Sequence, residues 1–271
     1  MIRPAAVAGR FYPSDPAELN RQVDAYLRGD RTAAAKTRAL GCVVPHAGYM
    51  YSGHVAGAVY AALEMPARCI LLGPRHYPQG QPLAILSSGS FETPLGRASI
   101  DEPLASALAR ACPLLREDAV AHAREHSLEV QIPFLQRIAG ASLRFAPIVL
   151  ATDRYGVMED LGQAIAEVVG AQTEPVLVIA SSDMNHYESD DVTRAKDQRA
   201  IAPILELNPR ALYDTVRNEG ITMCGYAATV ATLVAMQGLG AKSAKLVRYA
   251  TSGDVSGDRD QVVGYAGIVI Q

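Results

Sequence analysis

The sequence predicts an α/β fold: a three-layer sandwich with a mainly parallel central sheet flanked by helices. Two observations support this prediction. Short, nearly continuous apolar runs of the kind found in strands buried on both faces recur along the chain. They alternate with longer segments of helical spacing, as in α/β proteins. Because no repeat or Pro/Gly/Ser-rich linker divides the 271 residues, we expect a single domain over residues 1–271.

The expected elements follow in chain order. The apolar runs predict strands at 40–44, 68–72, 83–86, 145–149, 176–180, 245–249 and 265–270. Helical spacing predicts helices from Pro16 to about Tyr26 and over 53–63, 102–111, 125–138, 157–169, 191–206, 209–218 and 225–236. Ser14 and Asp15 provide start signals for the first helix, whereas Pro133 should kink or shorten the helix at 125–138.

Composition excludes several classes of function. The chain is 49% hydrophobic with a net charge of −3, so it is globular and has no overall basic field for nucleic acid. No apolar run is long enough for a membrane span, and no signal peptide is visible, so we expect a cytoplasmic protein. The four cysteines form no CxxC pair, and the absence of a phosphate-loop motif predicts no nucleotide cofactor.

Three of the predicted strands end in a loop that carries a histidine. His46 follows the first apolar run, His76 the second and His186 the fifth. Ligands of open α/β sheets bind beyond the carboxyl ends of the strands, so these side chains can point into one shared crevice. Imidazole suits iron, zinc, copper and nickel, and a metal site is therefore the economical hypothesis.

A second histidine cluster lies between residues 122 and 129. On a helix, His122, His126 and Glu129 would share one face, and Glu125 completes the inverted zinc motif HxxEH. An equally good interpretation leaves His122 in solvent and lets Glu129 cap or pair locally. A second-shell role for His126 and Glu129, orienting a ligand or substrate, lies between the two.

Cys224 lies where the chain enters a helix of small residues. The backbone amides and dipole at a helix start favour a thiolate, which binds metals or attacks electrophiles. The rival interpretation is therefore a cysteine nucleophile with a histidine base. The other three cysteines suit buried apolar positions or have no distinguishing context, and Tyr49 is one of several tyrosines beside the histidine loops that could line a pocket.

Taken together, these motifs resemble one family. The strings are Ala8–Pro13 (AGRFYP), Val44–Tyr49 (VPHAGY), Leu72–His76 (LGPRH), Glu125–Glu129 (EHSLE), Ser181–His186 (SSDMNH) and Met223–Gly225 (MCG). In this order they look like the Memo family, the B component of the AmmeMemoRadiSam set. The resemblance implies the fold of class III extradiol dioxygenases, which hold non-haem iron with two histidines and one carboxylate.

The resemblance also implies roles for particular residues. His46 and His76 match the two histidine ligands, and Cys224 matches the third ligand of Memo proteins. His186 matches the acid/base histidine of the dioxygenases, with Asp183 beside it as a further site residue. Because a thiolate replaces the dioxygenase carboxylate, metal preference and tolerance of oxygen should differ, and ring cleavage is not implied.

Three hypotheses follow from the sequence. The first is a dioxygenase-like or redox enzyme that uses Fe(II), or else copper or zinc, on a small-molecule or peptide substrate. The second is a non-catalytic metal- or peptide-binding protein that uses the same crevice, with other AmmeMemoRadiSam components as candidate partners. The third is a metal-free enzyme with Cys224 as nucleophile.

Overall fold

The computed structural model describes residues 1–29 and 36–271, and its strands join in one twelve-stranded sheet. The strands are β1 (Ile2–Arg3), β2 (Gly41–Val44), β3 (Arg68–Pro74), β4 (Leu83–Ile85), β5 (Ser90–Thr93), β6 (Gly96–Ile100), β7 (Arg116–Glu117), β8 (Arg144–Leu150), β9 (Val176–Ser181), β10 (His186–Glu188), β11 (Ala244–Thr251) and β12 (Val262–Ile270). Along the sheet they follow the order β1-β5-β6-β8-β3-β9-β2-β12-β10, while β11 pairs with β12 and β4 with β8.

The helices are α1 (Pro16–Arg28), α2 (Tyr49–Ala62), α3 (Glu102–Ala111), α4 (Ala119–Ala123), α5 (Ile132–Ala139), α6 (Tyr155–Gly170), α7 (Asp190–Leu205), α8 (Pro209–Asn218), α9 (Tyr226–Gly238) and α10 (Gly253–Ser256). Two 3₁₀ turns, η1 (Glu129–Gln131) and η2 (Gly140–Ser142), flank α5. Among the described residues, no helix combines the length and the apolar character that crossing a membrane requires.

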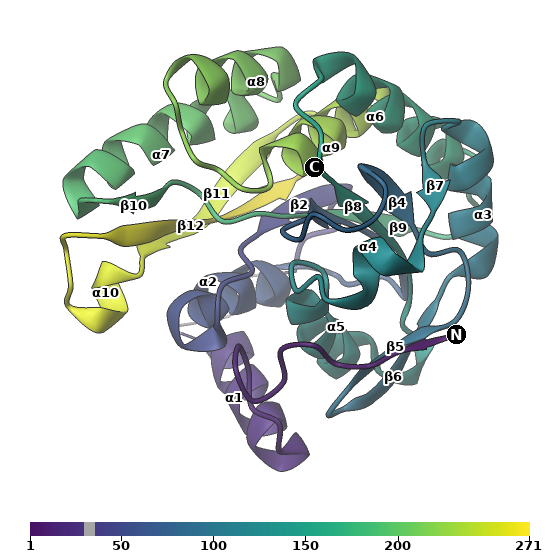
Figure 1. The fold of residues 1–271 in the computed structure, drawn as a ribbon, viewed down its shortest axis with the longest axis horizontal. Coiled ribbons are helices and arrows are strands. Elements are labelled where there is room, and N and C mark those ends of the chain that lie inside the picture. The colour runs from purple at the N-terminus through teal and green to yellow at the C-terminus, as the bar shows by residue number, and fades with distance from the viewer. Residues whose placement is uncertain (30–35) are drawn as a thin grey trace.

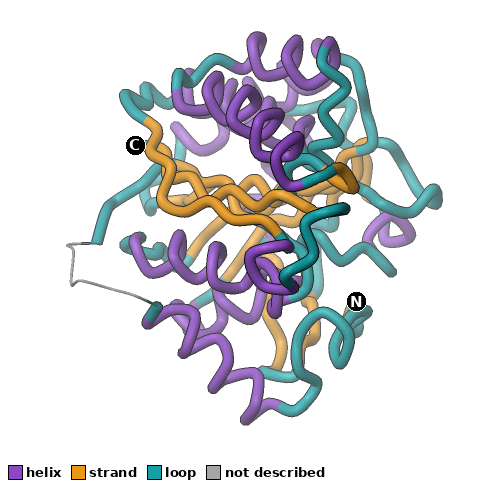
Figure 2. The backbone as a smooth tube through the Cα atoms, turned by 90° about the vertical axis from the view of Figure 1, so that its left-hand side faces the viewer, coloured by secondary structure: helices purple, strands orange, loops and turns teal. Residues whose placement is uncertain are grey.

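Helices cover both faces of the sheet, as Figures 1 and 2 show. On one face α1, α2 and α5 pack together and α2 contacts β2, β11 and β12. On the other face α9 lies against β3 and β9, with α6 and α8 packed on it. The central strands β8, β3, β9 and β2 are mutually parallel, and antiparallel pairs occur toward the edges. The predicted fold class, a sandwich around a mainly parallel sheet, is confirmed.

The central strands bring the candidate residues to one edge of the sheet. Every residue of β2, β3 and β9 is buried, as their continuous apolar runs predict. These strands run parallel, so their carboxyl ends at Val44, Pro74 and Ser181 lie on the same side of the molecule. The loops that follow them carry His46, His76 and the segment from Asp183 to His186.

The predicted helix over residues 125–138 is wrong in its first half. The chain ends α4 at Ala123, and the Glu125 carboxylate accepts a hydrogen bond from Ser127 N at 2.8 Å. A side chain bonded to the backbone in this way competes with helix formation. Pro133 lies in the first turn of α5, where its missing N–H costs nothing, so it starts a short helix instead of kinking a long one.

His122 and His126 therefore do not share a helical face, and the HxxEH interpretation fails. His122 is also not in solvent, because it is only 1% exposed and its ring packs edge-on against Phe91. The hairpin of β5 and β6 was missed as well, because its short strands carry no continuous apolar run.

Candidate metal centre

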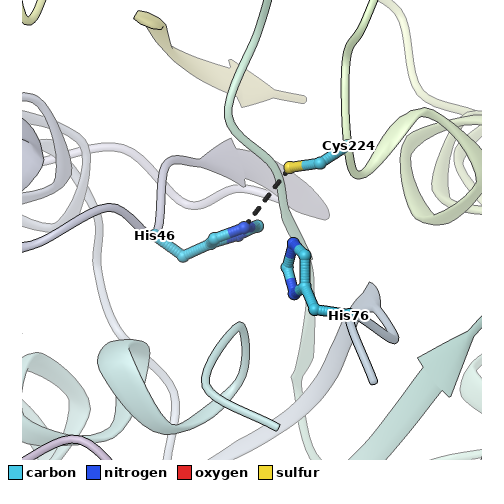
Figure 3. A group of neighbouring side chains, drawn as sticks. All are labelled: His46, His76 and Cys224. Carbon is cyan, nitrogen blue, oxygen red and sulfur yellow. Dashed lines mark hydrogen bonds between the residues drawn. The ribbon is translucent and has the colours of Figure 1, made fainter. Parts of the chain in front are cut away.

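The three residues predicted to be metal ligands lie close together in the structure. His46 follows β2, His76 follows β3, and Cys224 precedes α9. One ligand atom from each lies within 4.8 Å of the others, and Figure 3 shows the three side chains converging. His46 and Cys224 are in direct contact, with Nε2 and Sγ 3.3 Å apart.

The spacing of these atoms fits a shared metal ion. Metal–sulfur and metal–imidazole bonds of about 2.3 and 2.1 Å separate the two ligand atoms by about 3.1–3.6 Å for bond angles of about 90–110°. The 3.3 Å contact between Cys224 Sγ and His46 Nε2 falls within that range. Two imidazoles and one thiolate suit iron, copper or zinc better than they suit calcium or magnesium.

Hydrogen bonds fix the tautomer of His46. Its Nδ1 lies 3.0 Å from Ser181 Oγ, and that hydroxyl already donates its single hydrogen to the Ser127 carbonyl at 2.6 Å. The amide of Gln131 donates to the same oxygen at 2.8 Å. His46 Nδ1 must therefore carry a proton and donate it, which leaves the Nε2 lone pair directed at Cys224. Burial also lowers the pKa of His46 well below its usual value, so the ring stays neutral.

Glu125 fixes His76 in the same way. One carboxylate oxygen accepts from His76 Nδ1 at 2.9 Å, and the other accepts from the His76 backbone N at 2.5 Å. Burial opposes ionisation of Glu125, but its hydrogen bond to His76 and the nearby His76 and His126 rings outweigh this and lower its pKa to about 2. An ionised carboxylate can only accept, so His76 Nδ1 keeps its proton and Nε2 is free for a metal.

This role of Glu125 was not predicted from the sequence. The available signal was its position directly before His126, but that pattern was interpreted as a helical zinc motif. Glu125, His76 and His126 also form a group of possible ligand atoms. Since the Glu125 carboxylate is already engaged by His76 and Ser127, we assign it to orienting His76.

We expect Glu125→Gln to weaken metal binding by about 10- to 100-fold, the usual cost of losing an outer-shell partner of a metal-bound histidine. The amide keeps the size of the side chain but places N–H groups against the donors of His76. Competition titration with Zn(II) and a chromophoric chelator measures the affinity. Glu117→Gln is the matched control, because Glu117 is exposed and bonds Ser87 N at another edge of the sheet. An unchanged Zn(II) affinity in Glu125→Gln would contradict the role assigned to Glu125.

Gly225 allows the loop that carries Cys224 to pack closely against the end of β9. The Gly225 amide donates to Ser182 Oγ at 3.0 Å, and a Cβ on Gly225 would lie 2.5 Å from the Ser181 carbonyl oxygen. Glycine is therefore required for the loop before α9 to pack against the end of β9. This packing brings Cys224 Sγ within 3.3 Å of the Asp183 amide.

The surroundings of Cys224 oppose the thiolate that its position before a helix would favour. Burial, and secondarily the nearby Asp183 carboxyl, raise the pKa of the Cys224 thiol far above its usual value. Its hydrogen bond from the Asp183 amide only partly offsets this effect. Without a positive ion beside it, the thiol stays protonated, which argues against a metal-free cysteine nucleophile.

Asp183 and His186 lie on the Cys224 side of the cluster. A ligand atom from each lies within 4.8 Å of the other and of Cys224 Sγ. Asp183 Oδ1 accepts hydrogen bonds from the backbone N of His46 at 2.8 Å and of Ala47 at 3.3 Å, so it ties two of the loops together. Burial raises the pKa of Asp183, against the opposing effect of His186.

His126 borders the opposite side of the cluster. Its ring stacks on His76 with centroids 4.4 Å apart and contacts Phe11 at 4.8 Å. Its Nδ1 lies 3.5 Å from Glu125, and burial lowers its pKa. His126 thus lies directly beside the candidate ligand His76, and its predicted part in orienting a ligand or substrate stays a prediction.

Two predicted site residues lie elsewhere. Tyr49 is 1% exposed and donates its hydroxyl proton to the Val130 carbonyl at 2.7 Å, so it is a core residue and not a pocket wall. Glu129 is fully buried and binds the N-terminal segment: it pairs with Arg3 and accepts hydrogen bonds from Ala6 N at 2.8 Å and Val7 N at 3.0 Å. The contacts of both side chains are therefore with the core and the N-terminal segment, and neither residue belongs to the group of His46, His76 and Cys224.

Comparison with known proteins identifies the family. The family model described as "Memo-like protein" matches residues 3–269. The MEMO1 family protein MK0963 of Methanopyrus kandleri is 42% identical, with the alignment covering 100% of this chain and 99% of that protein. A MEMO1 family protein of Aquifex aeolicus is 40% identical over 99% of this chain and 98% of its own length.

A solved structure shares the fold at low sequence identity. The uncharacterized protein JW3007 of Escherichia coli K12 superposes with a TM-score of 0.56 at 12% identity, covering 84% of this chain and 99% of that one. From the family match and the full-length relatives, the chain belongs to the Memo-like protein family.

Proposed function

We propose that this protein is a mononuclear metal enzyme of dioxygenase-like or redox type, with His46, His76 and Cys224 as ligands and Fe(II) as the preferred ion. The observation that carries the proposal is the convergence of two histidines, each fixed with its Nε2 lone pair free, on one half-buried thiol. Three protein ligands leave further coordination positions for a substrate. When bound, the ion supplies Lewis acidity, a positive charge beside the thiolate and one-electron redox chemistry.

Side chains of the protein would carry out the proton transfers. His186 adjoins Cys224 and Asp183, so its imidazole can accept a proton from a substrate group held at the ion. Asp183, whose pKa burial raises, lies beside His186 and is held by backbone amides of the His46 loop. The His126 ring, which stacks on His76, also contacts Phe11 at an interplanar angle of 57°, so these two rings would supply apolar contacts to a molecule bound beside His76.

Anaerobic metal titration tests the proposal. Fe(II), Cu(I) and Zn(II) are added separately to the wild type and to His46→Ala/His76→Ala, and the bound metal is counted after desalting. We expect one ion per wild-type chain and none retained by the double variant. His54→Ala is the control, because His54 is half-buried on α2, outside the cluster. The proposal fails if the double variant binds Fe(II) as tightly as the wild type.

Cobalt substitution tests the thiolate separately. Co(II) bound to a cysteine thiolate gives a near-ultraviolet sulfur-to-metal charge-transfer band, which an oxygen ligand does not give. We expect this band in the wild type and its loss in Cys224→Ser. Its persistence in Cys224→Ser would remove Cys224 from the ligand set.

A further inference from the structure

The loop that carries His186 is bonded to the loop that leads to Cys224. Thr222 makes the contact: its hydroxyl accepts a hydrogen bond from the His186 backbone N at 2.7 Å, and its carbonyl accepts from His186 Nδ1 at 2.9 Å. A carbonyl oxygen has no proton to give. His186 Nδ1 must therefore be protonated, and Nε2 is the ring atom left to accept a proton.

Asn185 holds Thr222 in place. Its side-chain oxygen accepts from both Thr222 N at 3.1 Å and Thr222 Oγ1 at 3.0 Å. Its side-chain nitrogen donates to Glu188 at 2.7 Å, and its backbone N donates to Asp197 at 2.8 Å. Asn185 is fully buried, so each of these polar atoms would be costly to leave unpaired. The amide thus joins the segment before β10 to the segment before α9 from inside the protein.

We propose that Asn185 and Thr222 are positioning residues that hold His186, which lies beside Asp183 and Cys224, in the Nδ1–H tautomer with its Nε2 free. This rests on the proposed function, because it specifies how His186 works. The same tautomer follows from the hydrogen bonds of His46 and His76, made there by Ser181 and Glu125. The imidazoles of His46, His76 and His186 thus each present a free Nε2.

The tautomer specifies the class of molecule that this part of the site accepts. A neutral Nε2 is a hydrogen-bond acceptor, so the matching substrate group is a protic one: an O–H, N–H or S–H. On proton transfer, the bond between that atom and hydrogen breaks and a bond from hydrogen to His186 Nε2 forms. The electron pair stays on the substrate atom, and the resulting imidazolium keeps its Nδ1–H bond to the Thr222 carbonyl.

The proposal is tested by determining the tautomer of His186 in the reduced, metal-free protein. Long-range ¹H–¹⁵N NMR spectra of the histidine rings distinguish protonated from unprotonated ring nitrogens, and His186→Gln assigns the His186 signals. We expect Nδ1–H to dominate in the wild type. In Thr222→Val and Asn185→Ala, we expect the ratio of Nδ1–H to Nε2–H to fall by roughly 2- to 10-fold, the range that corresponds to one lost hydrogen bond.

Thr222→Ser is the matched variant, because it keeps the hydroxyl and should keep the wild-type ratio. The thermal midpoint of each variant is measured alongside, and the Val/Ser pair decides the outcome if Asn185→Ala does not fold. The proposal is overturned if wild-type His186 is mainly Nε2–H, or if Thr222→Val leaves the ratio unchanged. Since no metal is present, these outcomes are independent of whether the protein binds Fe(II).

Discussion

Replacing Glu129 with alanine is expected to lower the free energy of unfolding by about 3–5 kcal/mol, the usual cost of breaking a buried ion pair from one side. Glu129 is fully buried and pairs with Arg3, which is 3% exposed. Its carboxylate also accepts hydrogen bonds from Ala6 N, Val7 N and, at 2.6 Å, the Tyr12 hydroxyl. The variant leaves a buried guanidinium without its counter-ion and three donors without an acceptor.

Urea unfolding of Glu129→Ala measures this loss, with Asp214→Ala as the control. Asp214 pairs with Arg210 on the surface of α8, where both side chains are exposed, and such pairs contribute at most about 1 kcal/mol. Adding Arg3→Met to Glu129→Ala should recover part of the loss, because it removes the unpaired charge. A loss from Glu129→Ala no larger than that from Asp214→Ala would show that the buried pair does not secure the N-terminal segment.

The second large effect concerns pH. Asp197 is fully buried, and burial raises its pKa from 3.8 to about 7, although Asn185 N and the Tyr249 hydroxyl donate to it and Arg194 lies nearby. Between about pH 4 and pH 7, the folded protein therefore holds a proton that the unfolded chain has released. The stabilising contribution of this group is complete below pH 4 and is lost as the pH rises through 7. At 1.36 kcal/mol per tenfold change, the loss is about 4 kcal/mol.

Asp197→Asn mimics the protonated acid at every pH. We expect its free energy of unfolding, relative to the wild type, to rise by about 4 kcal/mol between pH 4 and pH 8. Urea denaturation at several pH values gives the two curves. Asp260→Asn, at an exposed position, should run nearly parallel to the wild type. Parallel curves for Asp197→Asn would mean that the Asp197 carboxyl titrates normally in the folded protein.

Several parts of the molecule could be predicted from the sequence because their signals are local. Continuous apolar runs predicted the buried strands β2, β3 and β9, and Ser14 and Asp15 before Pro16 predicted the start of α1. Ligands bind beyond the carboxyl ends of parallel strands, and this rule predicted that His46 and His76 lie in one crevice. The structure brings both beside Cys224.

The residues that orient those ligands could not be predicted, because their contacts are long-range. Glu125 reaches His76 across 49 residues, and Ser181 reaches His46 across 135. Neither contact produces a periodic pattern in the sequence, because each depends on the direction of a single side chain. The contacts of Tyr49 with Val130 and of Glu129 with Arg3 could not be predicted for the same reason, because proximity in sequence to a site residue does not fix which way a side chain points.

The separation of the candidate ligands along the chain has a consequence for folding. His46 and Cys224 are 178 residues apart, and β9 lies between β2 and β3 in the sheet, so the candidate ligands come together through contacts between distant parts of the chain. Because local contacts form before such distant ones, an ion held by these residues, as proposed, would bind the assembled sheet and would not serve as a template for early folding steps. Bound in this way, it would slow unfolding without speeding refolding, and at a thousand times its dissociation constant it would add about 4 kcal/mol. The lifetime of the protein against proteolysis would then rise and fall with the supply of the metal.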